Sequence, residues 1–130
     1  MAGSQPELLP GADTETRPRA SVGDPAHDWL CAWCHHRVAS EKDRFQYDGR
    51  SEFAFVNPDG IGFNIITFGR APGCRQVGQP TLDHTWFPQH AWSYAVCGGC
   101  GLHLGWHYTG PHHFVGLIRD RLVRALFVRN

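Results

Sequence analysis

The chain has no excess of either charge, because 12 Lys and Arg side chains balance 12 Asp and Glu side chains in 130 residues. Proteins that bind nucleic acid or anionic membranes without sequence preference usually have a surplus of Lys and Arg. One basic stretch lies near the C-terminus, at Arg119, Arg121, Arg124 and Arg129. Apolar residues between these arginines favour a solvated face over a phosphate site. We therefore expect neither nucleic acid nor a membrane among the partners.

Long apolar segments are also missing from the sequence. A membrane-spanning helix needs about 20 consecutive apolar residues, and the N-terminus lacks the apolar core of a secretory signal. We expect a cytoplasmic protein, in which paired cysteines are metal ligands before they are disulfides. The oligomeric state does not follow from the sequence, and a monomer is the default.

The chain divides into a tail and one domain. Residues 1–26 are rich in proline and poor in large apolar side chains, a composition that cannot bury enough surface to offset the entropy of ordering. We expect residues 1–26 to be a disordered N-terminal tail and residues 27–130 to be the folded, zinc-binding domain.

Short alternating or β-branched segments predict a mainly β domain. The expected strands span residues 52–56, 62–68, 92–96, 102–108 and 113–118. The run Asn57-Pro-Asp-Gly60 is a turn signal after the first of them. Apolar residues at positions 118, 122 and 126 recur every four residues, which predicts a short helix over residues 119–128.

Two Cys-x-x-Cys motifs, Cys31–Cys34 and Cys97–Cys100, predict a metal site. Two residues between cysteines let one tight turn present both sulfur atoms to a tetrahedral ion. Two such turns, or knuckles, complete a four-cysteine site without an open position, so the expected ion is one structural Zn²⁺. Gly98, Gly99 and Gly101 are expected to supply unusual backbone angles in the second knuckle.

Other interpretations of the cysteines are a redox motif or two disulfides, but a pair of motifs favours zinc. The histidines at positions 35, 36 and 103 are spare candidate ligands. The remaining thiol, Cys74, is more typical of a small buried side chain than of a nucleophile.

Aromatic residues gather around the second knuckle. Trp92 lies five residues before Cys97 and Trp106 lies six residues after Cys100. If the knuckle is a hairpin turn, the two rings are nearly opposite each other on paired strands. Tyr94, Leu104 and Tyr108 are expected to share their face. Pro88 would fold the preceding segment back, so that Trp86 joins the other two rings.

These tryptophans have two interpretations: ordinary core residues, or the walls of an aromatic box. A box could hold a cation, as methyl-lysine cages do. It could instead hold a flat neutral ring by van der Waals contact and a few hydrogen bonds. His84 is placed to offer a hydrogen bond beside Trp86, and Asp83 and Asp59 are the carboxylates that a cation cage would use.

The chain resembles the CULT domain, the cereblon-type thalidomide-binding domain, over roughly residues 28–120. The resemblance rests on Cys31-x-x-Cys34, Asn57-Pro58-x-Gly60, Gly78-x-Pro80, His84-x-Trp86-Phe87-Pro88, Ala91-Trp92, Cys97-x-x-Cys100 and His103-x-Gly105-Trp106. The short tail makes the chain similar to a stand-alone bacterial member. The resemblance implies a β-tent, two antiparallel sheets pinned by the four-cysteine zinc site.

The resemblance also implies a ligand. In the family, three tryptophans form a cage for cyclic imides such as the glutarimide ring of thalidomide-type drugs, and eukaryotic members recognise C-terminal cyclic imides on proteins. The corresponding residues here are the walls Trp86, Trp92 and Trp106, the further aromatic Tyr108, the hydrogen-bonding His84, and the loop residues Asn57, Pro58 and Phe63. The implied partner is a small cyclic imide or a modified protein C-terminus, and the implied function is non-enzymatic.

An enzyme is the rival interpretation. The run from Cys97 to Gly105 also resembles the zinc site of B-type methionine sulfoxide reductases. Those enzymes need a nucleophilic cysteine after the second knuckle, whereas Cys100 is the last cysteine here and Cys74 lies upstream.

Overall fold

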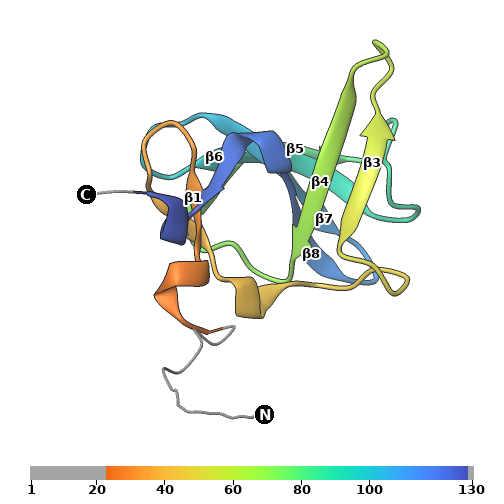
Figure 1. The fold of residues 1–130 in the computed structure, drawn as a ribbon. Helices are drawn as coiled ribbons and strands as arrows, with labels where there is room; N and C mark the ends of the chain where they lie inside the picture. Colours follow the sequence, from red (N-terminus) through yellow and green to blue (C-terminus); the bar gives the residue numbers. More distant parts are fainter. Residues whose placement is uncertain (1–22, 129–130) are drawn as a thin grey trace.

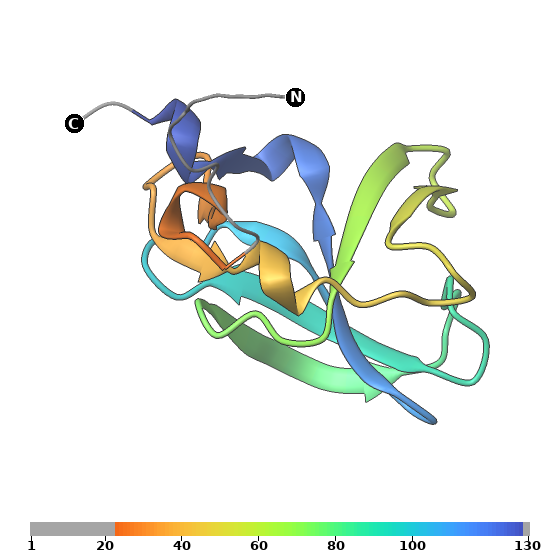
Figure 2. The same ribbon diagram turned by 60° about the horizontal axis from the view of Figure 1, so that its bottom comes forward.

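The structure is a computed structural model that describes residues 23–128. Its largest element is a six-stranded antiparallel sheet. In spatial order its strands are β3 (Glu52–Val56), β4 (Gly62–Phe68), β8 (His113–Ile118), β7 (His103–Thr109), β6 (Ala91–Cys97) and β5 (Cys74–Thr81). The sheet curls, so that β3 and β4 run at a steep angle to β5 and β6 (Figure 1, Figure 2).

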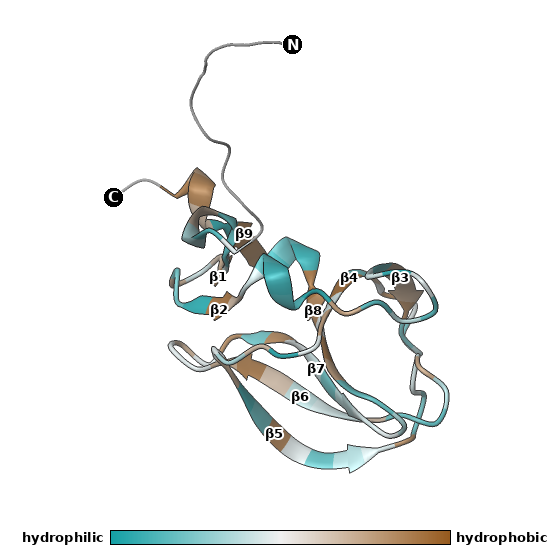
Figure 3. Cartoon of the chain, turned by 90° about the horizontal axis from the view of Figure 1, so that it is seen from below, coloured by the Kyte–Doolittle hydropathy of each residue, from teal (hydrophilic) through white to brown (hydrophobic). Residues whose placement is uncertain are grey.

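A second, three-stranded antiparallel sheet covers the knuckle end of β6. Its strands are, in spatial order, β2 (Arg37–Ala39), β1 (Trp29–Cys31) and β9 (Leu122–Arg124). In Figure 3 the small sheet lies above and to the left of β5, β6 and β7, and the β3–β4 hairpin lies above and to the right of them. The prediction of a mainly β fold with two antiparallel sheets and clustered cysteines is confirmed.

The described residues contain short 3₁₀ turns and no α-helix. The turns are η2 (Pro25–His27), η3 (Glu41–Asp43), η4 (Arg119–Arg121) and η5 (Ala125–Phe127). No helix in residues 23–128 is long and apolar enough to cross a membrane. Most of the predicted tail, residues 1–26, lies outside the described residues, and its last two positions, Pro25 and Ala26, belong to η2.

The predicted helix over residues 119–128 is wrong. That segment forms η4, β9 and η5, because β9 pairs with β1 through Leu30↔Val123 and Cys31↔Leu122. Of the three apolar residues that suggested a helix, Ile118 and Leu122 are buried and Leu126 is 46% exposed. Pairing with β1 uses the backbone groups of residues 122–124 that a helix would have bonded internally.

The five expected strands are present with bounds within one residue of those predicted. Four further strands had too weak a pattern to be predicted. β1, β2 and β9 have three residues each, which is too short to show a period. β5 is an exposed edge strand interrupted by Gly78 and Pro80, and both residues normally oppose strand assignment.

The sheets enclose two hydrophobic clusters. The first, the metal-side cluster, lies between the two sheets and includes Trp29, Cys31, Val38, Phe68, Cys97, Leu104 and Leu117. The second, the aromatic cluster, includes Phe53, Ile65, Phe87, Trp106, Tyr108, Phe114 and Ile118. β7 contributes to both clusters, with Leu104 in the first and Trp106 and Tyr108 in the second.

Candidate functional site

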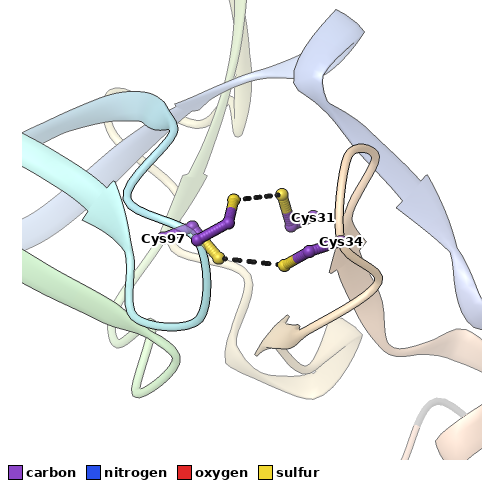
Figure 4. Close-up of side chains that lie close together, drawn as sticks. Cys31, Cys34 and Cys97 are labelled. Carbon is purple, nitrogen blue, oxygen red and sulfur yellow. Dashed lines mark hydrogen bonds between the residues drawn. The ribbon is translucent and has the colours of Figure 1, made fainter.

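The four cysteines of the two motifs come together between the sheets. All four Sγ atoms lie within 4.8 Å of one another. Cys31 Sγ is 3.7 Å from Cys100 Sγ, and Cys34 Sγ is 3.6 Å from Cys97 Sγ. A tetrahedral ion with metal–sulfur bonds of about 2.3 Å places its sulfurs about 3.8 Å apart. Figure 4 shows the two knuckles approaching from opposite sides.

The two knuckles have the same backbone geometry. In each, the carbonyl of the first cysteine accepts a hydrogen bond from the residue four positions later, His35 N at 2.8 Å and Gly101 N at 2.8 Å. That residue has a positive φ in both knuckles, 63° at His35 and 80° at Gly101. The left-handed conformation suits Gly101 and is tolerated by His35 at a modest cost.

Gly98 and Gly99 serve a different purpose from the one predicted. Neither has a positive φ. A Cβ atom on Gly98 would lie 2.8 Å from Gly73 O, and one on Gly99 would lie 3.0 Å from His36 Cβ. These two glycines let neighbouring segments approach closely, and only Gly101 supplies the unusual backbone angle.

The cysteine cluster fits a thiolate-bound metal. Burial raises the pKa of the Cys31 thiol to about 12, so a nearby cation is needed to hold it as a thiolate, the ligand form. The spare candidate His103 has both ring nitrogens engaged elsewhere. Cys74 pairs across the strands with Cys97, and burial raises its pKa to about 12. Cys74 is therefore a packed, protonated thiol.

Beside this cluster, an open cavity of about 310 Å³ lies on the aromatic side of β6 and β7. Its lining consists of Asn57, Pro58, Phe63, His84, Trp86, Trp92, Tyr94, His103, Trp106 and Tyr108. All eight residues predicted for ligand binding are in this set. The structure thus brings them to one place, and their binding role stays a prediction.

The tryptophans are core residues and cavity walls at once. Trp106 is 9% exposed and belongs to the aromatic cluster. Trp86 stacks on Phe55 with 4.9 Å between ring centroids and meets Trp106 edge-on, also at 4.9 Å. Trp92 packs on the periphery of the same cluster. One side of each ring is therefore held by packing while another part borders the cavity.

A β-bulge in β7 places the rings on one face. Ala95 pairs with Gly105 and Val96 pairs with His103, so Leu104 has no partner across the strands. Beyond this bulge, Trp92 pairs with Tyr108 and Tyr94 pairs with Trp106. A regular hairpin would have paired Trp92 with residue 107 and placed Trp106 on the opposite face, because side chains alternate along a strand.

The bulge also changes the neighbours that were predicted for the cavity. Leu104 was expected on this face, but it is fully buried in the metal-side cluster. His103 takes its place and meets Trp106 edge-on at 5.1 Å. His103 was missed as a cavity residue, and Tyr94 was expected on this face without being assigned a binding role. A bulge leaves no clear signal in a single sequence.

The segment that carries His84 and Trp86 is held by its own side chains. Thr85 Oγ1 donates to His90 O at 2.6 Å. His90 is buried, and its ring bonds Pro88 O and accepts from His112 N, at 2.8 and 3.2 Å. These contacts connect the loop to the β7–β8 turn and so restrict the position of Trp86.

The indole N–H groups of Trp86 and Trp92 both donate hydrogen bonds to backbone carbonyls. Trp86 Nε1 donates to Val56 O at 3.2 Å, and Trp92 Nε1 donates to Asp83 O at 2.7 Å. Because both donors are used, these walls offer mainly ring surface to a ligand. His84 is exposed with φ 56°, a conformation in which histidine is enriched among non-glycine residues.

The cavity lining contains no Asp, Glu, Lys or Arg side chain. Burial raises the pKa of Tyr108, so its phenol stays protonated. Burial also lowers the pKa of His103, with the Arg121 guanidinium adding to the shift. The cavity is thus a largely aromatic surface with a few polar groups and no Asp, Glu, Lys or Arg side chain.

Comparison with known proteins shows similarity to cereblon. The chain is 38% identical to protein cereblon of Gallus gallus over 76 residues, or 54% of this chain and 17% of that protein. It is 39% identical to protein cereblon of Xenopus tropicalis over 75 residues, or 53% of this chain and 17% of that protein. With the Danio rerio protein it shares 36% identity over 79 residues, covering 56% and 18%.

The matched segment thus spans under a fifth of the length of these curated relatives. No family model matches the chain. The similarity supports a cereblon-like domain, which fits a ligand-binding role for the aromatic cavity.

Proposed function

We propose that this chain is a non-enzymatic, CULT-type domain that holds a cyclic imide in the cavity between Trp86, Trp92 and Trp106. The observation that carries the proposal is an aromatic cavity of about 310 Å³ without Asp, Glu, Lys or Arg in its lining, located on a cereblon-like domain. Its volume lies at the lower end of the range of about 300–1,000 Å³ that is usual for small-molecule pockets. A compact ring therefore suits it better than a long chain.

The chemistry of a glutarimide matches this lining. Its methylene edge would contact the aromatic walls, and its imide edge would need hydrogen-bond partners, because each unpaired polar group costs about 1–3 kcal/mol. His84, on the loop beside Trp86, and Asn57, on the β3–β4 loop, are the polar residues that we assign to the imide. Tyr108 and Phe63 complete the apolar surface, and Pro58 borders the mouth.

We further propose that the four cysteines hold one structural Zn²⁺. Four thiolates in tetrahedral arrangement are typical of zinc, and the ion would tie β1 and β2 to the β6–β7 hairpin. Cysteines that serve as ligands favour a reducing compartment, so a cytoplasmic location stays our prediction. The natural ligand would be a small imide or a cyclic imide at a protein C-terminus.

The two rival functions find less support in the site. A cation cage usually includes a carboxylate, and the cavity lining has none. A methionine sulfoxide reductase would need a reactive thiol at the cavity, whereas Cys74 packs against the metal-side cluster and lies outside the lining. Both rivals can be tested with the same purified protein.

Titration of the zinc-loaded protein with a glutarimide compound, followed by tryptophan fluorescence and calorimetry, tests the proposal. We expect saturable binding that Trp92→Ala weakens at least about tenfold. Trp92 is the preferred target because it packs at the edge of the aromatic cluster, so the variant should fold. Trp33→Ala is the matched control, since Trp33 is 79% exposed and outside the cavity.

No saturable response in the wild type would overturn the proposal, as would equal binding by Trp92→Ala. Tighter binding of a trimethyl-lysine peptide than of the neutral imide would favour the cation cage. Turnover of methionine sulfoxide would favour the enzyme.

A further inference from the structure

His103 lines the cavity because of the β-bulge at Leu104. Its ring meets Trp106 edge-on at 5.1 Å and Tyr94 edge-on at 5.3 Å. His103 is thus packed between two lining residues, Tyr94 and Trp106. A change in its charge therefore changes the electrostatic potential inside the cavity. Bulges beside binding sites often re-aim one side chain in this way.

Two hydrogen bonds define the tautomer of this ring. His103 Nε2 lies 2.9 Å from Gly105 O, and a carbonyl oxygen can only accept, so Nε2 carries the proton. His103 Nδ1 lies 3.4 Å from Arg121 Nη1, and a guanidinium can only donate, so Nδ1 presents its lone pair. Both contacts are satisfied only by the neutral imidazole.

Arg121 is anchored independently of the ring. Its Nη1 also donates to the backbone carbonyl of His103 at 2.8 Å. The guanidinium therefore stays behind the imidazole when the ring is substituted. Protonation of Nδ1 would set an N–H against this guanidinium, which adds charge repulsion to the cost of burial.

The remaining charges around His103 do not oppose this effect. Arg121 reaches it from η4, while β6 and β7 present the neutral aromatic rings of Tyr94 and Trp106. Three carboxylates are near in sequence and all are exposed: Asp120 beside Arg121, Asp59 beside Pro58 and Asp83 beside His84, which is itself exposed. No ion pair within residues 23–128 involves His103.

We propose that Arg121 and His103 together determine the charge selectivity of the cavity. Arg121 keeps His103 neutral and places a fixed positive charge next to the His103 ring, so that the cavity accepts an uncharged ligand and disfavours a cation. This inference rests on the proposed function for its ligand. It adds two residues outside the predicted binding set, His103 as a wall and Arg121 as a positioning residue behind it.

The first test is an NMR titration of the imidazole in the zinc-loaded protein without ligand. In the wild type, His103 should titrate below the ordinary value of about 6.5 and show the chemical shifts of the Nε2–H tautomer. Arg121→Gln should raise its pKa, and Arg121→Lys should restore most of the depression. An ordinary wild-type value, or no rise in Arg121→Gln, would overturn the proposal.

The second test compares a neutral glutarimide with a trimethyl-lysine peptide at low ionic strength. Removal of one charge near the cavity should raise the ratio of cation to imide affinity about fivefold in Arg121→Gln. Arg119→Gln is the matched control, because Arg119 lies in the same turn but over the Trp29 ring. An unchanged ratio in Arg121→Gln, with imide binding intact, would overturn this inference alone.

The pH dependence of imide binding distinguishes the role of Arg121 from that of His103. Between pH 8 and pH 5.5, imide binding by Arg121→Gln should weaken more than binding by the wild type, because His103 becomes charged in the variant while His84 is common to both proteins. The double variant with His103→Phe should lose this additional weakening. If the wild type binds no imide at all, the proposed function fails, and the NMR titration still decides whether Arg121 controls the charge of His103.

Discussion

At the scale of single residues, glycine sets how closely the strands under the cavity approach. Gly105 on β7 pairs with Leu117, and Trp106 pairs with Gly116. A Cβ atom on Gly105 would lie 2.0 Å from Gly116 O, and one on Gly116 would lie 3.2 Å from Tyr108 Cε2. The missing side chains therefore leave room for neighbouring backbone and for the ring at the cavity floor.

Replacement of Gly105 by Ala should be costly. The clash involves backbone atoms, which cannot rotate away, so we expect overpacking to lower the free energy of unfolding by about 2–3 kcal/mol or more. Chemical denaturation of the zinc-loaded protein measures this change. Gly62→Ala is the control, because a Cβ atom there would meet only Phe55 O at 3.9 Å. Equal stability of the two variants would contradict the prediction.

At the scale of elements, the β3–β4 loop is shaped by one side chain. Asn57 Oδ1 accepts from Asp59 N at 3.0 Å and from Ile61 N at 2.9 Å. Gly60, with φ 83°, completes the turn. Val56, just before the turn, bonds the indole of Trp86 through its carbonyl. The loop and one wall of the cavity are thus coupled through backbone contacts.

Asn57→Ala should loosen this loop without unfolding the domain. The turn is largely exposed, so we expect a loss of about 1 kcal/mol or less in global stability. Amide exchange in residues 57–61 should accelerate, and imide affinity should fall several-fold. Asn57→Asp keeps the accepting oxygen and should restore slow exchange. Unchanged exchange in Asn57→Ala would show that the backbone alone defines the turn.

At the scale of the whole molecule, the cysteine cluster joins segments that are far apart in the chain. It connects the β1–β2 knuckle to the β6–β7 knuckle, and β7 continues to the aromatic cavity. The metal-side cluster around it contains many of the buried residues of both sheets. Removal of the proposed ion should therefore alter the cavity as well as the knuckles.

Removal of the metal by a strong chelator should unfold the domain. Zinc binding by small four-ligand sites contributes about 10–16 kcal/mol at neutral pH, which exceeds the stability of a typical domain of about 5–15 kcal/mol. Thermal melting with metal content checked by mass spectrometry measures the effect. Cys74→Ser should keep both metal and fold, whereas retained cooperative melting of metal-free wild type would contradict the prediction.

Stability should also decline in mild acid. Burial lowers the pKa values of His103 and His107 below about 6.5 in the folded state. Between the folded and unfolded pKa values the unfolded chain binds more protons, so the free energy of unfolding rises with pH. The contribution of the two neutral histidines to the free energy of unfolding is fully present above their pKa in the unfolded chain. It is lost as the pH falls through their lower pKa values in the folded state.

Melting temperatures measured from pH 8 to pH 5.5 at constant metal content test this dependence. His107→Gln should reduce the slope of the profile, because it removes one of the two buried imidazoles whose protonation opposes folding. His113→Gln, at an exposed position, should leave the profile unchanged. A wild-type profile without slope below pH 6.5 would contradict the prediction.

The sequence by itself determined the features that depend on local spacing. The Cys-x-x-Cys pairs, the turn at Asn57-Pro-Asp-Gly60 and the longer strands follow from backbone geometry over a few residues. The density of tryptophan around Cys97 and Cys100 likewise indicated where an aromatic site would lie.

Only the tertiary structure decided how these features face one another. The unpaired Leu104 reverses the alternation of β7 and puts Trp92 and Trp106 on one face. Pairing with β1 turns residues 122–124 into a strand in place of a helix. Arg121 reaches His103 from a different element. Each outcome depends on contacts between segments distant in sequence, whose energies outweigh the weak local preferences of the residues involved.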